Sequence, residues 1–366
     1  MKENNHKKKE LETMRGSLKN IKPLFAMVAA VGMLASTAEA REFTIASWGG
    51  TYQEAQRNTY FTPFSKDTGT AFLEDTYLGG WAQFQAMQDT KQFPWDVVQV
   101  ETSELVRGCE EGVFVTLDWS KIVPKTELLP DAVSECGLGM LVWSVVIAYN
   151  GDNVKKQPAT LTDFWDTKTW PGKRGMRKGP KLNLEFALMA DGVAPADVYK
   201  ILNTPAGVDR AFKKLGQIKP LVQWWEAGAQ APEWLAAGDV ELSIAYNGRI
   251  TNAQKDGKNL KMIWDRTIFA IDSWAIIKGA PNVDVGYKFL KYTTDPGRQA
   301  EFTKSYAYGP THKAGISMVA PDRAKSLPAG DNLKTGLFGG SKEALEFWVD
   351  FQEEMTERWN RWVAQN

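Results

Sequence analysis

Histidine and cysteine often carry acid–base, nucleophilic or metal chemistry, and both are scarce in this chain of 366 residues. It contains two histidines, His6 and His312, and two cysteines, Cys109 and Cys136. The sequence has no Gly-x-Ser-x-Gly, His-Glu-x-x-His, Walker A or Gly-x-Gly-x-x-Gly motif. Paired carboxylates and oxygen-ligand metal sites stay open, because sequence alone gives no geometry for the many acids. The pattern favours a protein that is not an enzyme and needs no cofactor and no metal.

Tryptophan is abundant, with 15 residues. Most of them are expected in the core, but those at strand ends or in loops are better placed to wall a cleft. Aromatic walls suit a ligand with methylene groups or an ammonium group, which gains cation–π attraction. The tryptophans in such positions are Trp48, Trp81, Trp225 and Trp274.

A basic segment at 171–182 contains five lysines and arginines and no acid. It leads into an expected helix at 183–190, whose N-terminus would attract an anion. One interpretation is that Lys181 or Arg177 binds a carboxylate or phosphate; the other is a solvated basic face.

The N-terminus has the three parts of a secretory signal. Lysines and arginines precede the apolar stretch 24–35, and Ala38-Glu39-Ala40 follows. We therefore predict a signal peptide over 1–40, cleaved before Arg41, and a periplasmic protein. In that oxidising compartment Cys109 and Cys136 are expected to form a structural disulfide.

Composition excludes further classes. The 44 basic and 44 acidic residues balance, which argues against a nucleic-acid-binding protein.

Strands and helices alternate along the chain, which predicts an α/β protein with largely parallel sheets and ligands beyond the carboxyl ends of strands. Trp48 to Tyr52 and Glu101 to Ser103 lie at two such ends. The expected strands are 43–47, 71–76, 96–100, 141–150, 172–176, 221–225, 240–246, 262–264 and 269–277.

The expected helices include one that starts at a Thr51/Glu54 capping box and stops at Gly69. At the other end of the chain, an apolar stripe over 341–364 predicts a helix docked on a lobe. Two α/β regions joined by crossing strands describe a hinged protein with its ligand in the cleft. The remaining helices are expected at 81–90, 103–108 or 103–112, 160–165, 183–190, 208–215, 231–237, 251–256, 286–293 and 298–305.

Several short stretches, in order along nearly the whole chain after residue 40, resemble periplasmic solute-binding proteins of ABC importers, of the spermidine/putrescine-binding type. The resemblance begins at Ile45-Ala46-Ser47-Trp48-Gly49-Gly50-Thr51-Tyr52 and continues at Trp95-Asp96-Val97-Val98. Later matches are Asp163-Phe164-Trp165, Pro171-Gly172-Lys173, the segment 233–240, Tyr246-Asn247-Gly248, Ile271-Asp272-Ser273 and Tyr308-Gly309-Pro310-Thr311.

The resemblance implies a type II periplasmic-binding-protein fold: two α/β lobes joined by a two-strand hinge, with a ligand cleft between them. Lobe 1 is then expected over 41–147 plus 271–315, and lobe 2 over 148–270 plus 316–366. It also implies a monomer that captures a small-molecule solute and passes it to permease subunits in the inner membrane.

Polyamine-binding relatives imply aromatic ligand contacts at Trp48, Tyr246 and Tyr308, and an ammonium partner at Asp272. Asp272 lies in an apolar run, where an unpaired carboxylate would be costly. Where polyamine binders supply further acids, this chain has lysines, and Arg249 adds a cation near the cleft. The ligand is therefore either a polyamine or an amino-carboxylate such as an amino acid or opine, with a small carboxylate anion held by the basic lobe as the alternative. The expected ligand-binding residues are Trp48, Tyr52, Glu101, Lys181, Trp225, Tyr246, Arg249, Asp272 and Tyr308.

Overall fold

The computed structural model describes residues 41–77 and 79–365. Residues 41–366 form one compact unit by their contacts, so the expected lobe boundaries stay predictions. The predicted signal peptide lies outside the described residues. Within them, no helix combines the length and the apolar character needed to cross a membrane.

The N-terminal part builds a parallel arrangement around β1 (Phe43–Ser47), which pairs with β2 (Phe72–Thr76) on one side and β3 (Val97–Val100) on the other. All five residues of β1 are buried, as its apolar character predicts. The helices that connect or follow these strands are α2 (Gly50–Gln56), a π-helical turn (Arg57–Phe61), α3 (Thr62–Thr68), α4 (Ala82–Thr90) and α5 (Thr102–Glu110).

The helix after β1 starts differently from the prediction. The predicted Thr51/Glu54 capping box does not form, because the chain turns at Gly49 and Gly50, both with positive φ, and α2 begins at Gly50. The side chain of Gln53 caps the turn instead, by accepting a hydrogen bond of 2.9 Å from the Gly49 N–H. A Cβ on Gly49 would lie 2.8 Å from Thr76 Cγ2, so this tight turn requires glycine.

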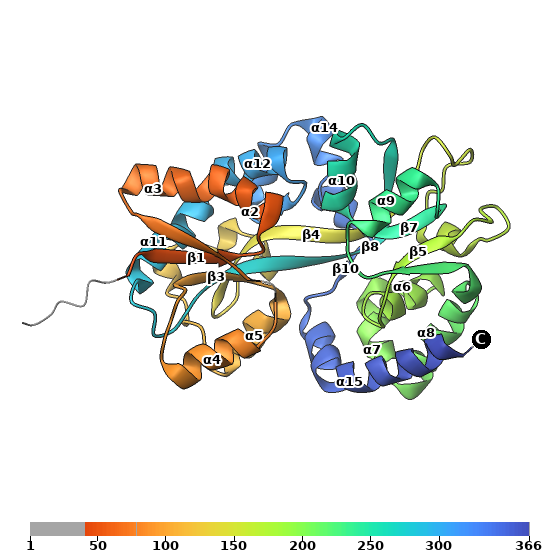
Figure 1. Ribbon diagram of the computed structural model, residues 1–366, viewed down its shortest axis with the longest axis horizontal. Helices are drawn as coiled ribbons and strands as arrows, with labels where there is room; N and C mark the ends of the chain where they lie inside the picture. The colour runs from red at the N-terminus through yellow and green to blue at the C-terminus, as the bar shows by residue number, and fades with distance from the viewer. Residues whose placement is uncertain (1–40, 78, 366) are drawn as a thin grey trace, which may run out of the picture. The chain divides into compact units, whose positions relative to one another are not determined.

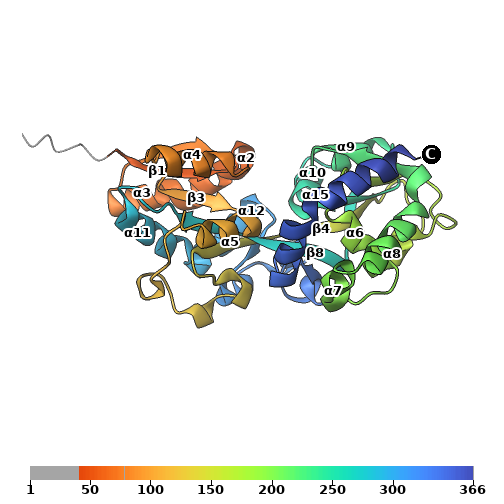
Figure 2. The same cartoon turned by 90° about the horizontal axis from the view of Figure 1, so that it is seen from below.

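Two long strands, β4 (Gly137–Asn150) and β8 (Leu260–Ile276), run antiparallel to each other through the middle of the sheet. β8 merges the two strands predicted at 262–264 and 269–277. β4 also pairs with β7 (Leu242–Tyr246), and β8 with β3, so the two long strands connect both parts of the sheet (Figure 2). Their register shifts between Gly139 and Leu141 and again between Val145 and Ile147.

The second part of the sheet contains β7, β5 (Arg174–Arg177) and β6 (Val222–Trp225), which are parallel to one another. The complete order is β2-β1-β3-β8-β4-β7-β5-β6, with short strands β9 (Gly309–Pro310) on β4 and β10 (Leu337–Phe338) on β8. The sheet is thus mixed and open, rather than largely parallel, because β4 and β8 run antiparallel to each other at its centre (Figure 1). The helices here are α6 (Asn183–Ala190), α7 (Val198–Leu202), α8 (Pro205–Gly216), α9 (Gln230–Ala237) and α10 (Asn247–Lys255).

Separate hydrophobic cores lie towards the two ends of the long strands. One gathers buried residues of β1, β3, α11 (Val283–Thr293) and α12 (Pro296–Ser305) with the first half of β4. The other gathers residues of the second half of β4, α6, α8, α9 and β7. The predicted C-terminal helix is α15 (Lys342–Ala364), and its buried Trp348, Met355 and Trp359 belong to this second core, which confirms the docked helix. The chain between α12 and α15 adds α13 (Lys313–Ser317) and α14 (Pro321–Ala324).

The predicted disulfide is confirmed. Cys109 and Cys136 are bonded, with their Cα atoms 5.6 Å apart, and this bond ties the end of α5 to the residue before β4.

Candidate functional site

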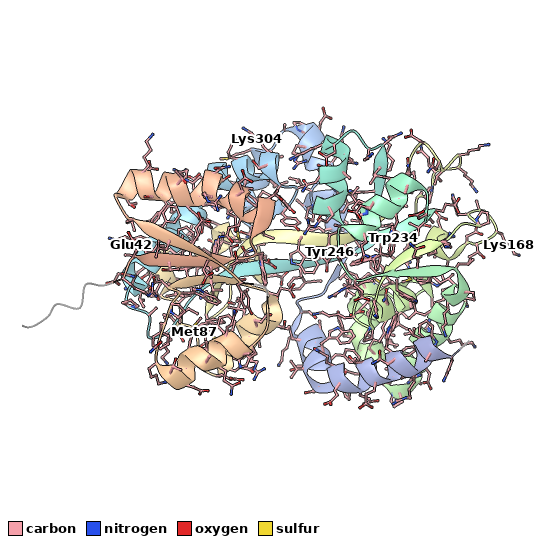
Figure 3. All side chains as sticks on the ribbon, viewed as in Figure 1. Glu42, Met87, Lys168, Trp234, Tyr246 and Lys304 are labelled. Carbon is pink, nitrogen blue, oxygen red and sulfur yellow. A yellow bond between two sulfur atoms is a disulfide. The ribbon has the colours of Figure 1, made fainter. Side chains whose placement is uncertain are left out.

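A cavity of about 280 Å³ opens at the ends of β1, β3 and β7, beside the two long strands. Seven of the nine residues predicted to bind ligand line it, and they come from segments more than 200 residues apart in sequence. Tyr246, labelled in Figure 3, lies where β7 ends beside β4 and β8. The predicted residues in the cavity wall are Trp48, Tyr52, Glu101, Tyr246, Arg249, Asp272 and Tyr308.

Asp272 is the electrostatic centre of this cavity. Its side chain is buried and accepts three hydrogen bonds, all from neutral N–H donors. Oδ2 accepts from the indole of Trp48 at 2.9 Å and from the amide of Gln99 at 3.0 Å, while Oδ1 accepts from the indole of Trp143 at 2.8 Å. A carboxylate offers about four acceptor positions. One position, on Oδ1, therefore stays open for a ligand.

The environment of Asp272 favours a cationic partner. Burial raises its pKa, and the nearby carboxylate of Glu101 raises it further, while the hydrogen bonds from Trp143, Trp48 and Gln99 lower it. No described lysine or arginine forms an ion pair with Asp272. A ligand ammonium group would supply the missing positive charge and stabilise the ionised form.

Gln99 connects Asp272 to a buried polar network beneath the cavity. It stands on β3, fully buried, and its amide also lies 2.7 Å from the hydroxyl of Tyr52. Its oxygen accepts from the amide of Gln56 at 2.7 Å and from the hydroxyl of Ser47 at 3.0 Å. These contacts leave the side chain of Gln99 little freedom, so the position of Asp272 Oδ2 is fixed before any ligand arrives.

Aromatic rings supply the rest of the wall. Tyr308 packs against Tyr306 and Tyr52, with ring centroids 4.9 and 5.9 Å apart, and Tyr246 packs edge-on against Trp143 at 5.7 Å. Burial raises the pKa of Tyr246, so its hydroxyl stays neutral and polar at physiological pH. The cavity therefore offers apolar surface for methylene groups between its charged positions.

Arg249 provides a positive charge in the same cavity. It stands in the first turn of α10, directly after β7, and its side chain is exposed. Among the described residues it forms no ion pair and donates no side-chain hydrogen bond. An unpaired guanidinium beside a carboxylate-bearing aromatic cavity is suited to hold an anionic group.

Two predicted ligand residues lie elsewhere. Trp225 is 1 % exposed and donates its indole N–H to the Ile244 carbonyl at 3.2 Å, so it supports Tyr246 from the core and lines no part of the cavity. Lys181 lines two adjoining cavities but not this one. Of the other proposed wall residues, Trp81 stacks with Arg107, and Trp274 is fully buried.

The sequence did not point to Trp143, Gln99 or Tyr306. Trp143 lies inside an apolar strand with no turn or charge beside it, and its hydrogen bond to Asp272 depends on the pairing of β4 with β8. The signal that could have found Tyr306 is its place two residues before Tyr308.

Comparison with known proteins decides the family. Residues 59–329 match the model of the family described as bacterial extracellular solute-binding protein. The chain belongs to this family. It is a solute-binding receptor of an ABC importer and not an enzyme, as predicted.

Individual relatives differ in what they bind. The chain is 43% identical to a gamma-aminobutyric acid-binding protein of Pseudomonas aeruginosa over 330 residues, 90% of this chain and 93% of that protein. It resembles a solved GABA receptor with a TM-score of 0.78 and 32% identity, covering 89% of this chain and 98% of the other. The spermidine/putrescine-binding periplasmic protein of Escherichia coli is 23% identical over 288 residues, 75% of this chain and 80% of that protein.

Proposed function

We propose that this receptor binds a small amino-carboxylate of the gamma-aminobutyric acid (4-aminobutyrate) type and delivers it from the periplasm to an inner-membrane permease. The observation that carries the proposal is the presence of one buried carboxylate, Asp272, and one unpaired guanidinium, Arg249, in a single cavity. The likeness to two proteins described as binding gamma-aminobutyric acid supports it.

In this proposal the ligand lies between opposite charges. Its ammonium group donates to the open position on Asp272 Oδ1, and its carboxylate accepts from Arg249. The methylene chain packs on the aromatic wall formed by Trp48, Tyr246 and Tyr308. Because Asp272 stands on β8 and Arg249 on α10, a ligand that contacts both would draw the two sides of the cleft together.

The polyamine that the sequence also suggested is a second candidate, favoured by one observation. Glu101 lines the same cavity as Asp272, so two acids are available to a ligand with two ammonium groups. Arg249 weighs against it, because a dication would meet an uncompensated positive charge in the cavity.

The export and assembly expected from the sequence form part of the proposal. We infer that the signal peptide is cleaved before Arg41 and that the receptor acts as a monomer. N-terminal sequencing and size-exclusion chromatography of the protein secreted to the periplasm test both points.

Isothermal titration tests the ligand. The panel contains 4-aminobutyrate, putrescine, spermidine and succinate, which separate the amine, the carboxylate and their combination. We expect 4-aminobutyrate to bind, and its affinity to fall about 100-fold in Asp272→Asn and in Arg249→Gln. The exposed Asp239→Asn is the matched control and keeps full affinity. Binding of putrescine or spermidine that is strengthened in Arg249→Gln would instead establish the polyamine alternative.

A further inference from the structure

A second cavity, of about 330 Å³, adjoins the first. The two share three wall residues, Glu101, Trp143 and Tyr246, so the cleft continues past them. Either cavity alone lies near the lower end of the roughly 300–1,000 Å³ that small-molecule sites occupy. The cleft as a whole has room for a ligand larger than the simplest amino-carboxylate.

The second cavity contains an excess of positive charge. Arg177, Lys178 and Lys181 line it, and Glu101 is the acid among its wall residues. Lys178 is already paired, with its ammonium 2.8 Å from Glu226 Oε1 at an exposed position. Arg177 and Lys181 form no ion pair with any described residue, and both are only partly exposed. Two unpaired cations therefore face a cavity that the proposed ligand does not fill.

Tyr246 separates the two groups of cations. Burial raises the pKa of its hydroxyl, while the guanidinium groups of Arg177 and Arg249 both lower it. Arg249 belongs to the wall of the first cavity and Arg177 to the wall of the second, so positive charge lies on both sides of the Tyr246 ring. Since Arg249 satisfies the single carboxylate of an amino-carboxylate, Arg177 has no partner in that ligand.

A further part of the wall of the second cavity is polar. It is formed by α15, which contributes Gln352 and Thr356 beside Trp348. The indole of Trp348 donates to Glu185 Oε1 at 2.9 Å, so that ring is held in place. Gln352 is exposed and its side-chain amide is able to donate a hydrogen bond to an acidic group, whereas the hydroxyl of Thr356 already donates to the Gln352 carbonyl at 2.7 Å.

We propose that the second cavity is a subsite for a second acidic group of the ligand, held by Arg177 and Lys181. The receptor would then take amino acids that carry two carboxylates, or a carboxylate and another acidic group, more tightly than 4-aminobutyrate. This inference rests on the proposed function, because it places the amine at Asp272 and the first carboxylate at Arg249.

Titration with a matched ligand pair tests the subsite. 3-(Aminomethyl)pentanedioate is 4-aminobutyrate with one added carboxymethyl branch, and L-glutamate and 2-aminoadipate carry the second carboxylate at other positions. We expect at least one of the three to bind about tenfold more tightly than 4-aminobutyrate, as one charge-assisted contact allows. The combined variant Arg177→Gln/Lys181→Gln should abolish this preference and leave 4-aminobutyrate affinity unchanged within about threefold.

Lys178→Gln is the control, since it removes a cation of the same cavity that is already paired. It should retain the preference. The subsite is refuted if 4-aminobutyrate binds but none of the three diacids binds more tightly, or if the preference survives the double variant. Absence of binding by 4-aminobutyrate and by the diacids, with polyamines bound instead, refutes the proposed function itself.

Discussion

The indole N–H of Trp143 lies 2.8 Å from Oδ1 of Asp272, and the two residues stand on the adjacent long strands β4 and β8. Trp143 therefore has two roles in one side chain. Its ring walls both cavities, and its N–H stabilises the negative charge that an amine ligand needs.

Trp143→Phe separates these roles, because phenylalanine keeps an aromatic wall and loses the donor. Loss of the hydrogen bond raises the pKa of Asp272, so the affinity for 4-aminobutyrate should fall about tenfold at pH 7 and less at pH 9. Titration at both pH values measures this. Trp81→Phe, which changes an indole stacked on Arg107 outside the cavity, is the control. An equal loss at the two pH values would contradict the electrostatic role.

The protonation state of Asp272 predicts a pH profile. Burial and Glu101 raise its pKa to about 8 in the ligand-free protein, whereas an alkylammonium ligand stays charged up to roughly pH 10. Below the raised pKa, binding must release the proton of Asp272, so affinity should fall by about tenfold per pH unit as the pH decreases. Calorimetry in buffers of different ionisation enthalpy should detect this proton. A profile that is flat from pH 5 to pH 9 would show that Asp272 is ionised throughout.

The hydrogen bonds to Asp272 also predict selectivity between cations. A guanidinium group binds a carboxylate best through both oxygens, but Trp48 and Gln99 already occupy Oδ2. An ammonium group needs a single acceptor position. We expect 4-guanidinobutyrate to bind at least about tenfold more weakly than 4-aminobutyrate in competition titrations. Comparable affinity of the two compounds would mean that Oδ2 is accessible.

Glu185 predicts an effect on stability. It is 1 % exposed, Oε1 accepts from Trp348 and Tyr199, Oε2 has no partner among the described residues, and burial raises its pKa. A carboxyl whose pKa is raised on folding is destabilising when ionised, so its contribution to stability falls as the pH rises through the interval between the unfolded and folded values. Glu185→Gln removes this charge and keeps an acceptor for both donors.

Thermal unfolding should therefore show Glu185→Gln with a melting temperature above that of the unmodified protein by a few degrees at pH 8, and with little difference at pH 4. The exposed Glu226→Gln serves as the control at both pH values. A lower melting temperature at pH 8 would indicate that the ionised form is stabilised in the folded protein.

The disulfide predicts a larger effect on the stability of the folded protein than Glu185 does. Cys109 and Cys136 are 27 residues apart, and closing such a loop lowers the entropy of the unfolded chain by an amount worth about 3.5 kcal/mol. Replacing both by alanine should reduce the free energy of unfolding by up to that amount in a denaturant titration. Ligand affinity should not change, because neither cysteine lines the cavities described. A loss of affinity would show that the bond positions α5 and Glu101.

Much of the fold could be predicted from the chain because its signals are local. The β1 strand is an apolar run between polar residues and coincides with the predicted strand, and α3 ends at Gly69, as predicted, where φ is positive. The continuity of β8 could not be predicted. Its middle residues, including Asp265 and Arg266, are polar and interrupt the apolar pattern, and they lie in the register shift where β8 has no partner residues on β4.

The residues of the site also divide into those that could be predicted from the sequence and those that could not. Asp272 could be predicted as a site residue because a carboxylate in an apolar run needs a partner, and in the structure three donors bind it. The burial of the Trp225 ring could not be predicted, because a position at the end of a strand does not tell which side of the sheet the ring occupies. Trp143 was missed because its contact with Asp272 spans 129 positions in sequence.

The two register shifts of β4 against β8 lie on either side of the segment Leu141–Val145, within which the pairing is regular and Leu141 lies opposite Asp272. Bulges and irregular pairs are where a sheet bends most readily. The pairing of β4 with β8 thus has two irregular points and a regularly paired segment between them, and Asp272 and Trp143 both belong to that segment. A bend at either register shift would leave the contact between Trp143 and Asp272 intact, so this half of the ammonium anchor would keep its geometry while the sheet changes shape.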